Sequence, residues 1–270
     1  MSLPWRDEVG VYLSPRRLVM VRLQRGLRPK TVLEMCYPVE TQAPNDWRAA
    51  VGSLASHLAE PAWAGAGLRV AVADQWVRQS VVPAVAGLES IAERLVYGRH
   101  WLAQTYGELG EDWQLTLGDG LPGRPFVVSA LPAALLASLR EVAAGAGNTL
   151  LSVQPQLVVA YDRWRKRLPD HGWLVTLDEG YLSAAQLAPH GWERIHAVRI
   201  GENWSAELRR LRALGRLTAG VDAQRVFIDS PRWLRAALPP LHDDGLEWLE
   251  DDQPQRSALH EVVRARGMYA

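Results

Sequence analysis

The order of predicted elements repeats once along this chain, and that duplication constrains the fold more than any single motif. Residues 9–23 hold two short runs rich in Val and Leu, separated by a Ser-Pro pair. Residues 173–187 hold two similar runs, separated by Asp-Glu-Gly. Apolar runs of this length joined by turn residues are typical of β-hairpins. The chain therefore contains two candidate hairpins in different parts of the sequence.

Each hairpin is followed by the same series of further elements. A third strand is expected at 31–39 and at 194–200, then an amphipathic helix, then a buried-looking strand at 68–73 and at 225–229. The helices place apolar residues at helical spacing, namely Trp47, Val51, Leu54 and Leu58 in the first case and Leu208, Leu211 and Leu214 in the second. The order strand, strand, strand, helix, strand occurs twice and predicts a duplicated α/β fold.

Additional elements lie between the two repeats. They are strands on either side of a turn at 74–75, a helix at 88–109, strands at 112–117 and 124–130, a helix opening at Pro132, a strand at 148–154 and a helix at 155–164. The 88–109 helix is expected to bury Ile91, Leu95, Leu102 and Tyr106. We expect a first half at 1–166 with an inserted α+β subdomain at about 75–123, and a second half at 167–270.

Composition excludes several classes of protein. The chain has 270 residues with 30 basic and 30 acidic side chains, so bulk charge gives no reason to expect nucleic acid as a partner. The single cysteine, Cys36, excludes an internal disulfide and is expected to be a small buried hydrophobe. No apolar run approaches the roughly 18 residues of a membrane span, and the N-terminus lacks a signal-peptide pattern. The sequence predicts a soluble, cytoplasmic protein.

The chain resembles the actin-like ATPase superfamily in three stretches. They are Val70–Pro83, with a strand pair ending in Arg and Pro, Phe126–Val153, with a strand, a helix, an Ala-Gly pair and a strand, and the apolar helix Leu157–Tyr161. Within that superfamily the chain is most similar to the PilM-like proteins of type IV pilus assembly and to the cytoplasmic domain of the type II secretion L protein. The resemblance implies two ribonuclease-H-like, actin-like βββαβ halves.

Nucleotide-binding members of this fold carry an Asp-x-Gly turn in each hairpin, where backbone N–H groups approach phosphates. At the matching positions of the first hairpin stand Tyr12 and Ser14, so both the carboxylate and the glycine are absent. In the second hairpin Thr176 and Asp178 match, and a shifted reading gives Asp178-Glu-Gly180. Asp and Gly are also what any hairpin turn prefers. The phosphate loops are therefore expected to be degenerate.

The adenosine end of the expected pocket is also incomplete. Members that hold ATP have a Gly-Gly pair after the late strand, whereas here Asp229 is followed by Ser230 and Pro231. The second repeat passes from strand to helix through Gly201 and Glu202, which leaves no room for the subdomain that walls the nucleotide. The resemblance thus implies a pseudo-ATPase without catalytic residues, cofactor or metal.

Other constellations favour no alternative chemistry. The seven histidines lack metal-ligand spacing, and no Gly-x-Ser-x-Gly elbow is present. An acidic cluster, typical of a solvated or partner-docking face, comprises Asp243, Asp244, Glu247, Glu250, Asp251 and Asp252. Trp164 and Trp248 stand among charged residues and are candidates for partner anchors. The segment after Leu241 is a candidate for a tail that folds on binding.

The resemblance implies a non-catalytic adaptor at the cytoplasmic face of the inner membrane. Its expected partner is the cytoplasmic peptide of a bitopic assembly protein, an assembly ATPase, or both. Strand addition at an edge of the inserted subdomain is the expected binding mode. The candidate partner-binding residues are Val77, Gln79, Val81, Gln114 and Thr116.

Two other functions stay open, and so does homodimerisation. The first is a sugar-kinase-like, ATP-dependent phosphotransferase of the same superfamily, which would use Asp178. The second is a ribonuclease-H-like nuclease, for which Asp178 and Asp229 are the carboxylates available at strand ends. Magnesium-dependent nucleotide binding would separate the phosphotransferase from the adaptor.

Overall fold

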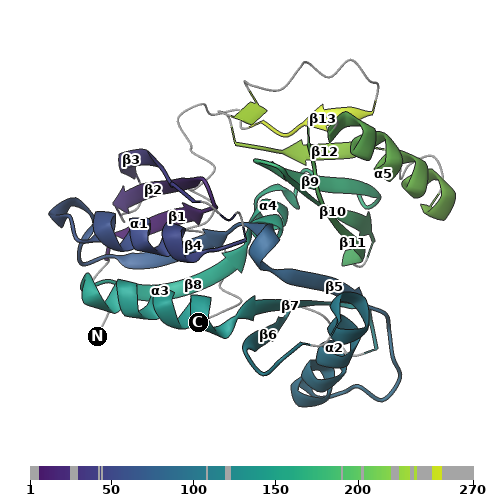
Figure 1. The fold of residues 1–270 in the computed structure, drawn as a ribbon. Coiled ribbons are helices and arrows are strands. Elements are labelled where there is room, and N and C mark those ends of the chain that lie inside the picture. Colours follow the sequence, from purple (N-terminus) through teal and green to yellow (C-terminus); the bar gives the residue numbers. More distant parts are fainter. Residues whose placement is uncertain are drawn as a thin grey trace. The chain divides into compact units, whose positions relative to one another are not determined.

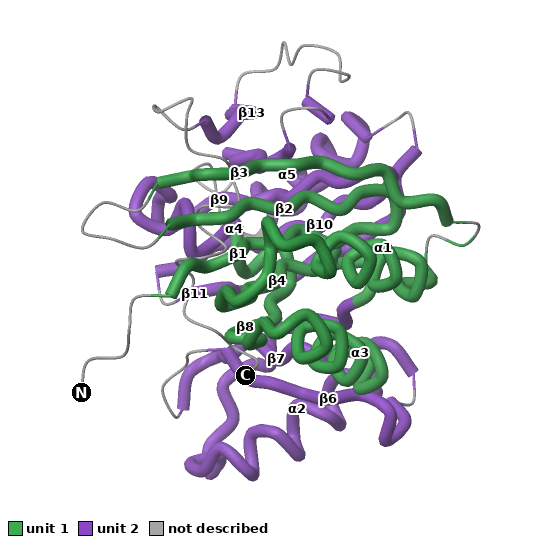
Figure 2. Tube along the Cα trace, turned by 90° about the vertical axis from the view of Figure 1, so that its left-hand side faces the viewer, with its two compact units in different colours: residues 1–76, 131–159, 251–270 green, residues 77–130, 160–250 purple. Residues whose placement is uncertain are grey.

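The computed structural model describes residues 6–24, 30–41, 43, 45–107, 109–118, 123–189, 191–201, 204–219, 225–231, 234–235 and 245–250. The chain divides into two compact units (Figure 2). The first contains residues 1–76 and 131–159, and the second contains residues 77–130 and 160–250. The segment predicted as an inserted subdomain thus groups with the second repeat.

The first unit is built on a five-stranded sheet in the order β3-β2-β1-β4-β8 (Figure 1). β1 pairs antiparallel with β2 and parallel with β4. The helices α1 and α3 contact each other, α1 also contacts β2, and α3 contacts β8. The elements are β1 (Glu8–Leu13), β2 (Arg17–Gln24), β3 (Lys30–Pro38), α1 (Arg48–Leu58), η1 (Pro61–Trp63), β4 (Gly67–Val72), η2 (Asp74–Trp76), α3 (Ala133–Gly145) and β8 (Thr149–Pro155).

The second unit contains a sheet of the same design, in the order β11-β10-β9-β12-β13. β9 pairs antiparallel with β10 and parallel with β12, as β1 does with β2 and β4. Its elements are β9 (Gly172–Asp178), β10 (Tyr181–Ala188), β11 (Gly191–Arg199), α5 (Trp204–Ala219), β12 (Val226–Asp229) and β13 (Leu246–Trp248). The predicted duplication of βββαβ is confirmed.

A smaller sheet in the order β5-β7-β6 also belongs to the second unit, and α2 contacts β5 and β6. Its elements are β5 (Arg78–Val82), α2 (Ile91–Tyr106), β6 (Trp113–Leu117) and β7 (Phe126–Pro132). The helix α4 (Gln156–Trp164) follows β8 directly. Among the described residues, no helix has the length and apolarity that crossing a membrane requires.

The central strands are apolar because both of their faces are covered. Every residue of β1 and of β9 is buried. Strands that are covered on both faces read as continuous apolar runs, and this is the pattern seen in the sequence. β3 differs, because it lies at the edge of its sheet and most of its side chains are exposed.

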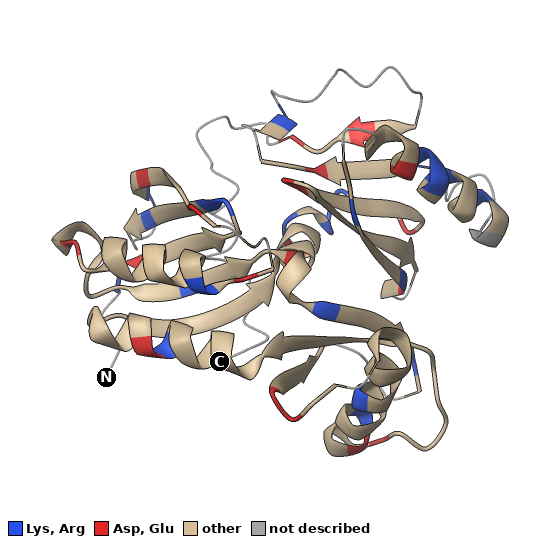
Figure 3. Cartoon of the chain, in the orientation of Figure 1, with Lys and Arg blue, Asp and Glu red and all other residues tan. Residues whose placement is uncertain are grey.

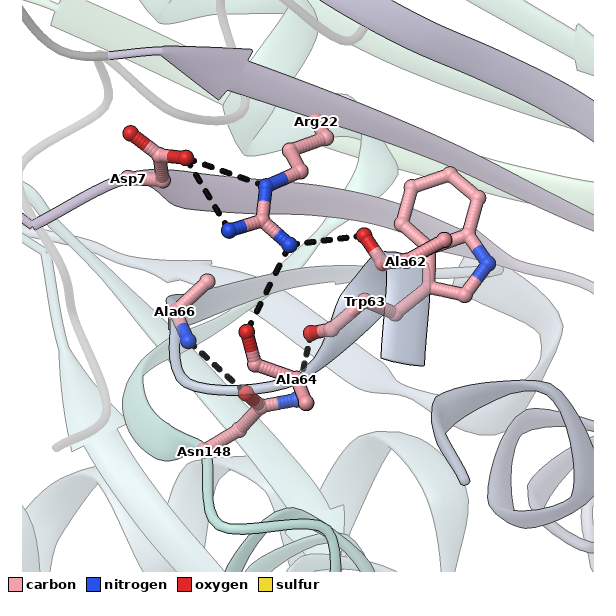
Figure 4. Close-up of polar contacts among 7 residues, drawn as sticks. All are labelled: Asp7, Arg22, Ala62, Trp63, Ala64, Ala66 and Asn148. Carbon is pink, nitrogen blue, oxygen red and sulfur yellow. Dashed lines mark hydrogen bonds and ion pairs between the residues drawn. The ribbon is translucent and has the colours of Figure 1, made fainter. Parts of the chain in front are cut away.

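Two polar side chains fix the loop between α1 and β4 in the first unit (Figure 4). Asn148 is buried, accepts a hydrogen bond from the Ala66 N–H at 2.9 Å and donates one to the Trp63 carbonyl at 3.1 Å. Arg22 pairs with Asp7 and donates to the Ala62 carbonyl at 2.6 Å. Buried backbone groups of an irregular loop need partners of this kind, so Asn148 takes the place of secondary-structure bonding.

The apolar stripe predicted for the 88–109 helix was partly wrong. Leu102 is fully buried, but Ile91 is 70% exposed and Tyr106 is 41% exposed. The buried stripe runs through Arg94, Gly98 and Leu102. A Cβ at Gly98 would approach the Val128 side chain to 3.0 Å, so the glycine sets which side of α2 lies against β7.

Two further residue predictions were wrong. Cys36 is exposed, because the sheet edge leaves β3 uncovered. Trp164 is only 2% exposed, with Arg163 and Arg167 stacked over its ring, so it is a core residue and not a surface anchor.

Part of the acidic cluster and most of the segment after Leu241 lie outside the described residues. This applies to Asp243, Asp244, Asp251 and Asp252. Glu247 pairs with Arg225, and Glu250 pairs with Arg235. Residues 246–248 form the strand β13, parallel to β12. That part of the segment is therefore built into a sheet.

Candidate functional site

Tyr12 fills the first predicted phosphate-loop position with a packed ring. Its side chain is 6% exposed and belongs to an apolar cluster with Val21, Leu23, Ala71 and Val159. Its hydroxyl donates to the Gln156 side-chain oxygen at 2.9 Å. A ring anchored in this way supplies bulk at the position where the resemblance predicts a phosphate-loop carboxylate.

The turn after β1 is closed by hydrogen bonds between its own residues. The Ser14 N–H donates to the Arg17 carbonyl at 2.9 Å, and the Ser14 hydroxyl donates to the same oxygen at 3.3 Å. Pro15 has no N–H to offer. Two of the backbone donors expected of a phosphate-binding turn are therefore either used internally or missing.

A carboxylate of the protein already occupies the start of α4. Asp74 is 6% exposed, and its Oδ1 accepts a hydrogen bond from the Leu157 N–H at 3.1 Å. The first N–H groups of a helix carry partial positive charge and favour anions. Because Asp74 already accepts from this N–H, a phosphate approaching the same donor would be repelled by the carboxylate and would have to displace it.

Sequence reasoning missed the contact between Asp74 and α4. The two residues are 83 positions apart, and no local motif joins them. One signal was present: Gln156 follows Pro155 directly, and no Ser, Thr, Asp or Asn precedes the helix to act as an N-cap. A helix start without a local cap predicts a distant acceptor.

The second hairpin keeps the only Asp-x-Gly turn among the predicted loop positions. Asp178 is 7% exposed, and its Oδ1 accepts a hydrogen bond from the Glu179 N–H at 2.8 Å. Gly180 has a φ of +78°, a left-handed conformation that favours glycine. Thr176 is buried and donates to the Ser183 carbonyl at 3.4 Å. These bonds lie within the hairpin of β9 and β10.

The end of β12 carries the other strand-end carboxylate of the second unit. Asp229 Oδ1 lies 3.7 Å from an Arg163 guanidinium nitrogen. β11 ends at Arg199 and α5 begins at Trp204, so four residues separate the strand from the helix. No group of three or more metal-ligating side chains is found in the described part of the chain.

The predicted partner-binding residues fall on opposite edges of the small sheet. Gln79 and Val81 are in β5, and Val77 immediately precedes it, whereas Gln114 and Thr116 are in β6, on the other side of β7. The structure therefore brings them together as two groups and not as one site.

The β5 edge is covered within its own unit. β11 contacts β5. The Tyr106 hydroxyl donates to the Gln79 carbonyl at 2.8 Å, and the Gln79 amide donates to the Ser129 hydroxyl at 3.0 Å. Burial raises the pKa of Tyr106, which keeps this donor protonated. Little of β5 remains for a partner strand.

The β6 edge offers backbone groups over a short stretch. The Gly118 N–H donates to the Val127 carbonyl of β7 at 2.8 Å. Alternate residues of a strand direct their backbone groups to opposite sides, so Leu115 and Leu117 direct theirs away from β7. The Trp113 carbonyl accepts a hydrogen bond from Arg99 at 3.1 Å. The edge available for pairing is therefore that of Leu115 and Leu117.

Structural comparison identifies the fold where sequence comparison finds nothing. No protein-family model matches the chain, and no curated protein matches it. Among solved structures, a PilM-PilN type IV pilus biogenesis complex is similar with a TM-score of 0.63 and 14% identity, over 91% of this chain and 89% of that one. The cytoplasmic domain of EpsL, an inner-membrane component of the type II secretion system of Vibrio cholerae, is similar with a TM-score of 0.58 and 13% identity, over 96% and 93%.

A third structure names the architecture itself. A Bacteroides thetaiotaomicron protein of unknown function with an actin-like ATPase fold matches with a TM-score of 0.61 and 9% identity, over 96% of this chain and 95% of that one. At such identities the likeness concerns the fold alone. Together with the duplicated βββαβ sheets, it establishes that this chain has the actin-like ATPase fold.

Proposed function

We propose that the chain is a non-catalytic adaptor of a type IV pilus or type II secretion machine, acting at the cytoplasmic face of the inner membrane. Its partner is the cytoplasmic peptide of a bitopic assembly protein, an assembly ATPase, or both. The observation that carries this proposal is the likeness over about nine-tenths of both chains to the PilM-PilN complex and the EpsL domain.

The local chemistry of the first unit supports the non-catalytic part of the proposal. Tyr12, with its hydroxyl on Gln156, stands where a phosphate-site carboxylate is expected. Asp74 bonds to the α4 start, where an incoming anion would otherwise find a donor. Either feature opposes phosphate binding, and an ATPase would have to overcome both.

The β6 edge supports the partner-binding part. A peptide that adds as a strand gains main-chain hydrogen bonds from an exposed edge, and its alternate side chains give specificity. β6 is an outer strand of its sheet, and the backbone groups of Leu115 and Leu117 face outward. Gln114 is exposed and Thr116 is half-buried, so both can contact a partner's side chains.

Peptide binding tests the adaptor function. Synthetic peptides that cover the cytoplasmic segments of bitopic pilus or secretion proteins from the same genome are titrated into the protein, with fluorescence anisotropy as the readout. Leu115→Pro removes an outward N–H and is expected to weaken binding by about tenfold or more. Leu115→Ala retains the N–H and serves as the matched control, with thermal melting to check folding. Equal binding by both variants would contradict strand addition at β6.

One observation favours a second candidate, an ATP-dependent phosphotransferase. The Asp178-Glu179-Gly180 turn retains the carboxylate and the left-handed glycine of a phosphate loop. This candidate requires magnesium-dependent nucleotide binding, which the adaptor does not.

A further inference from the structure

The outer face of α5 gathers positive charge. The helix has four arginines and a single acidic residue, Glu207. Arg209, Arg210 and Arg216 are exposed, and Figure 3 shows the basic segments along α5. Glu207 lies 2.9 Å from His196 Nε2 of β11 and also pairs with Arg210 at 3.4 Å, so it offsets one of the three exposed positive charges and leaves those of Arg209 and Arg216. The exposed side of α5 is therefore basic.

The core side of the same helix is fixed. Trp204, Leu208 and Leu211 are buried in the cluster that also contains residues of β9, β10 and β12. At about 3.6 residues per turn, positions 209, 210, 213, 216 and 217 fall on the opposite side. α5 thus presents three of its four arginines outward while its apolar side stays in the core.

Leu217 adds an apolar group to the basic face. Its side chain is 84% exposed, the highest exposure among the large apolar residues of the described chain that lie on the surface. Arginines together with an exposed leucine suit a lipid interface, where guanidinium groups contact phosphates and the leucine enters the boundary with the acyl chains. Nucleic acid is the weaker fit, because contacts to its phosphates use basic side chains and give the exposed leucine no apolar partner.

We propose that the outer face of α5, formed by Arg209, Arg210, Arg216 and Leu217, docks on the anionic phospholipid surface of a membrane. This inference rests on the proposed function for placing the protein beside a membrane. It concerns a different surface from the β6 edge, and it needs no protein partner.

Vesicle co-sedimentation tests the docking surface with the whole chain. The probes are vesicles of pure phosphatidylcholine and vesicles in which about a third of the lipid is phosphatidylglycerol. Binding is expected only to the anionic vesicles and should weaken as salt is added, because Debye screening shortens the reach of the charges. Binding to both kinds of vesicle alike, or to neither, would overturn the proposal.

Substitutions locate the surface. The triple variant Arg209→Gln, Arg210→Gln, Arg216→Gln is expected to bind anionic vesicles about a hundredfold more weakly, at about fivefold per arginine. A matched control removes the same charge from exposed positions elsewhere, through Arg140→Gln, Arg165→Gln and Lys166→Gln. An equal loss in the two triple variants would overturn the assignment to α5.

Two further variants separate lipid from an acidic polypeptide. Replacing the three α5 arginines with lysines retains the charge and should preserve vesicle binding, which also guards against a folding artefact. Leu217→Ser should weaken vesicle binding by about tenfold without affecting affinity for polyglutamate. Unchanged vesicle binding by Leu217→Ser, with polyglutamate binding as tight as vesicle binding, would reject the membrane in favour of an acidic protein. Peptide binding at β6 can succeed or fail independently of all these results.

Discussion

The two βββαβ repeats share one topology and differ in how their first hairpins are closed. In the first repeat Leu13 pairs with Leu18, so four residues form the connection and none of them is glycine. In the second, Asp178 pairs with Tyr181, and only Glu179 and Gly180 lie between them. A two-residue connection often needs a left-handed residue, and Gly180 supplies it with a φ of +78°. The same topology is therefore closed by two different turns, and of the two only the second has the sequence Asp-x-Gly.

The largest loss of stability is expected from truncating a buried helix leucine, and it should be similar in both repeats. Leu54 of α1 and Leu208 of α5 are each fully buried against their own sheet. Leu54→Ala and Leu208→Ala should each lower the free energy of unfolding by about 2–5 kcal/mol, through lost apolar burial and the cavity left behind. Urea denaturation followed by circular dichroism measures this loss.

Leu217→Ala is the control for that pair. Its side chain is 84% exposed, so the change in unfolding free energy should stay within about 0.5 kcal/mol. If Leu208→Ala cost no more than this control, the description of α5 as a core helix would be wrong.

The next largest loss of stability is expected from Asn148, a buried polar side chain of the first unit. Asn148 bonds to Trp63 and Ala66, and truncation leaves both buried backbone groups without that partner. Asn148→Ala should cost about 2 kcal/mol in unfolding free energy. Asn148→Asp retains one acceptor for the Ala66 N–H but loses the donor to Trp63, which makes it a matched probe. A neutral result for Asn148→Ala would show that the loop does not depend on this side chain.

The order of elements along the chain could be predicted because the apolar pattern of each element is present in the local sequence. The apolar runs of β1 and β9 and the helical spacing in α1 are short-range signals. The position of a strand at the edge of a sheet leaves no such local signal. Cys36 was therefore predicted to be buried, whereas it is exposed on β3, which has no neighbouring strand on one side. Ile91 fits the apolar period of α2, yet Gly98 decides which side of the helix faces β7.

Only part of the candidate site could be predicted for a similar reason. The missing carboxylate at Tyr12 and the missing glycine at Ser14 are visible in the sequence. The bonds from Tyr12 to Gln156 and from Leu157 to Asp74 join residues 144 and 83 positions apart, so they follow from tertiary packing.

The smallest changes in stability are expected at two glycines, one in a turn and one in a helix. A Cβ at Gly180 would meet no atom closer than the Ile200 carbonyl oxygen at 3.7 Å, so Gly180→Ala should cost only the left-handed conformation, about 1–2 kcal/mol. Gly52 lies within α1 with open space around it, and Gly52→Ala should instead stabilise by about 0.5–1 kcal/mol. Thermal melting of both variants compares them. A destabilised Gly52→Ala, or an unaffected Gly180→Ala, would contradict the assigned conformations.

The most direct test of the central claim is thermal melting of the protein with millimolar Mg-ATP against buffer. A ligand that binds only the folded state raises its stability by mass action, by about 2.7 kcal/mol at one hundred times the dissociation constant. The account predicts no shift, because Tyr12 is bonded to Gln156 at the expected phosphate-loop position and Asp74 is bonded to the start of α4. A clear magnesium-dependent rise in Tm would contradict it and would favour the phosphotransferase.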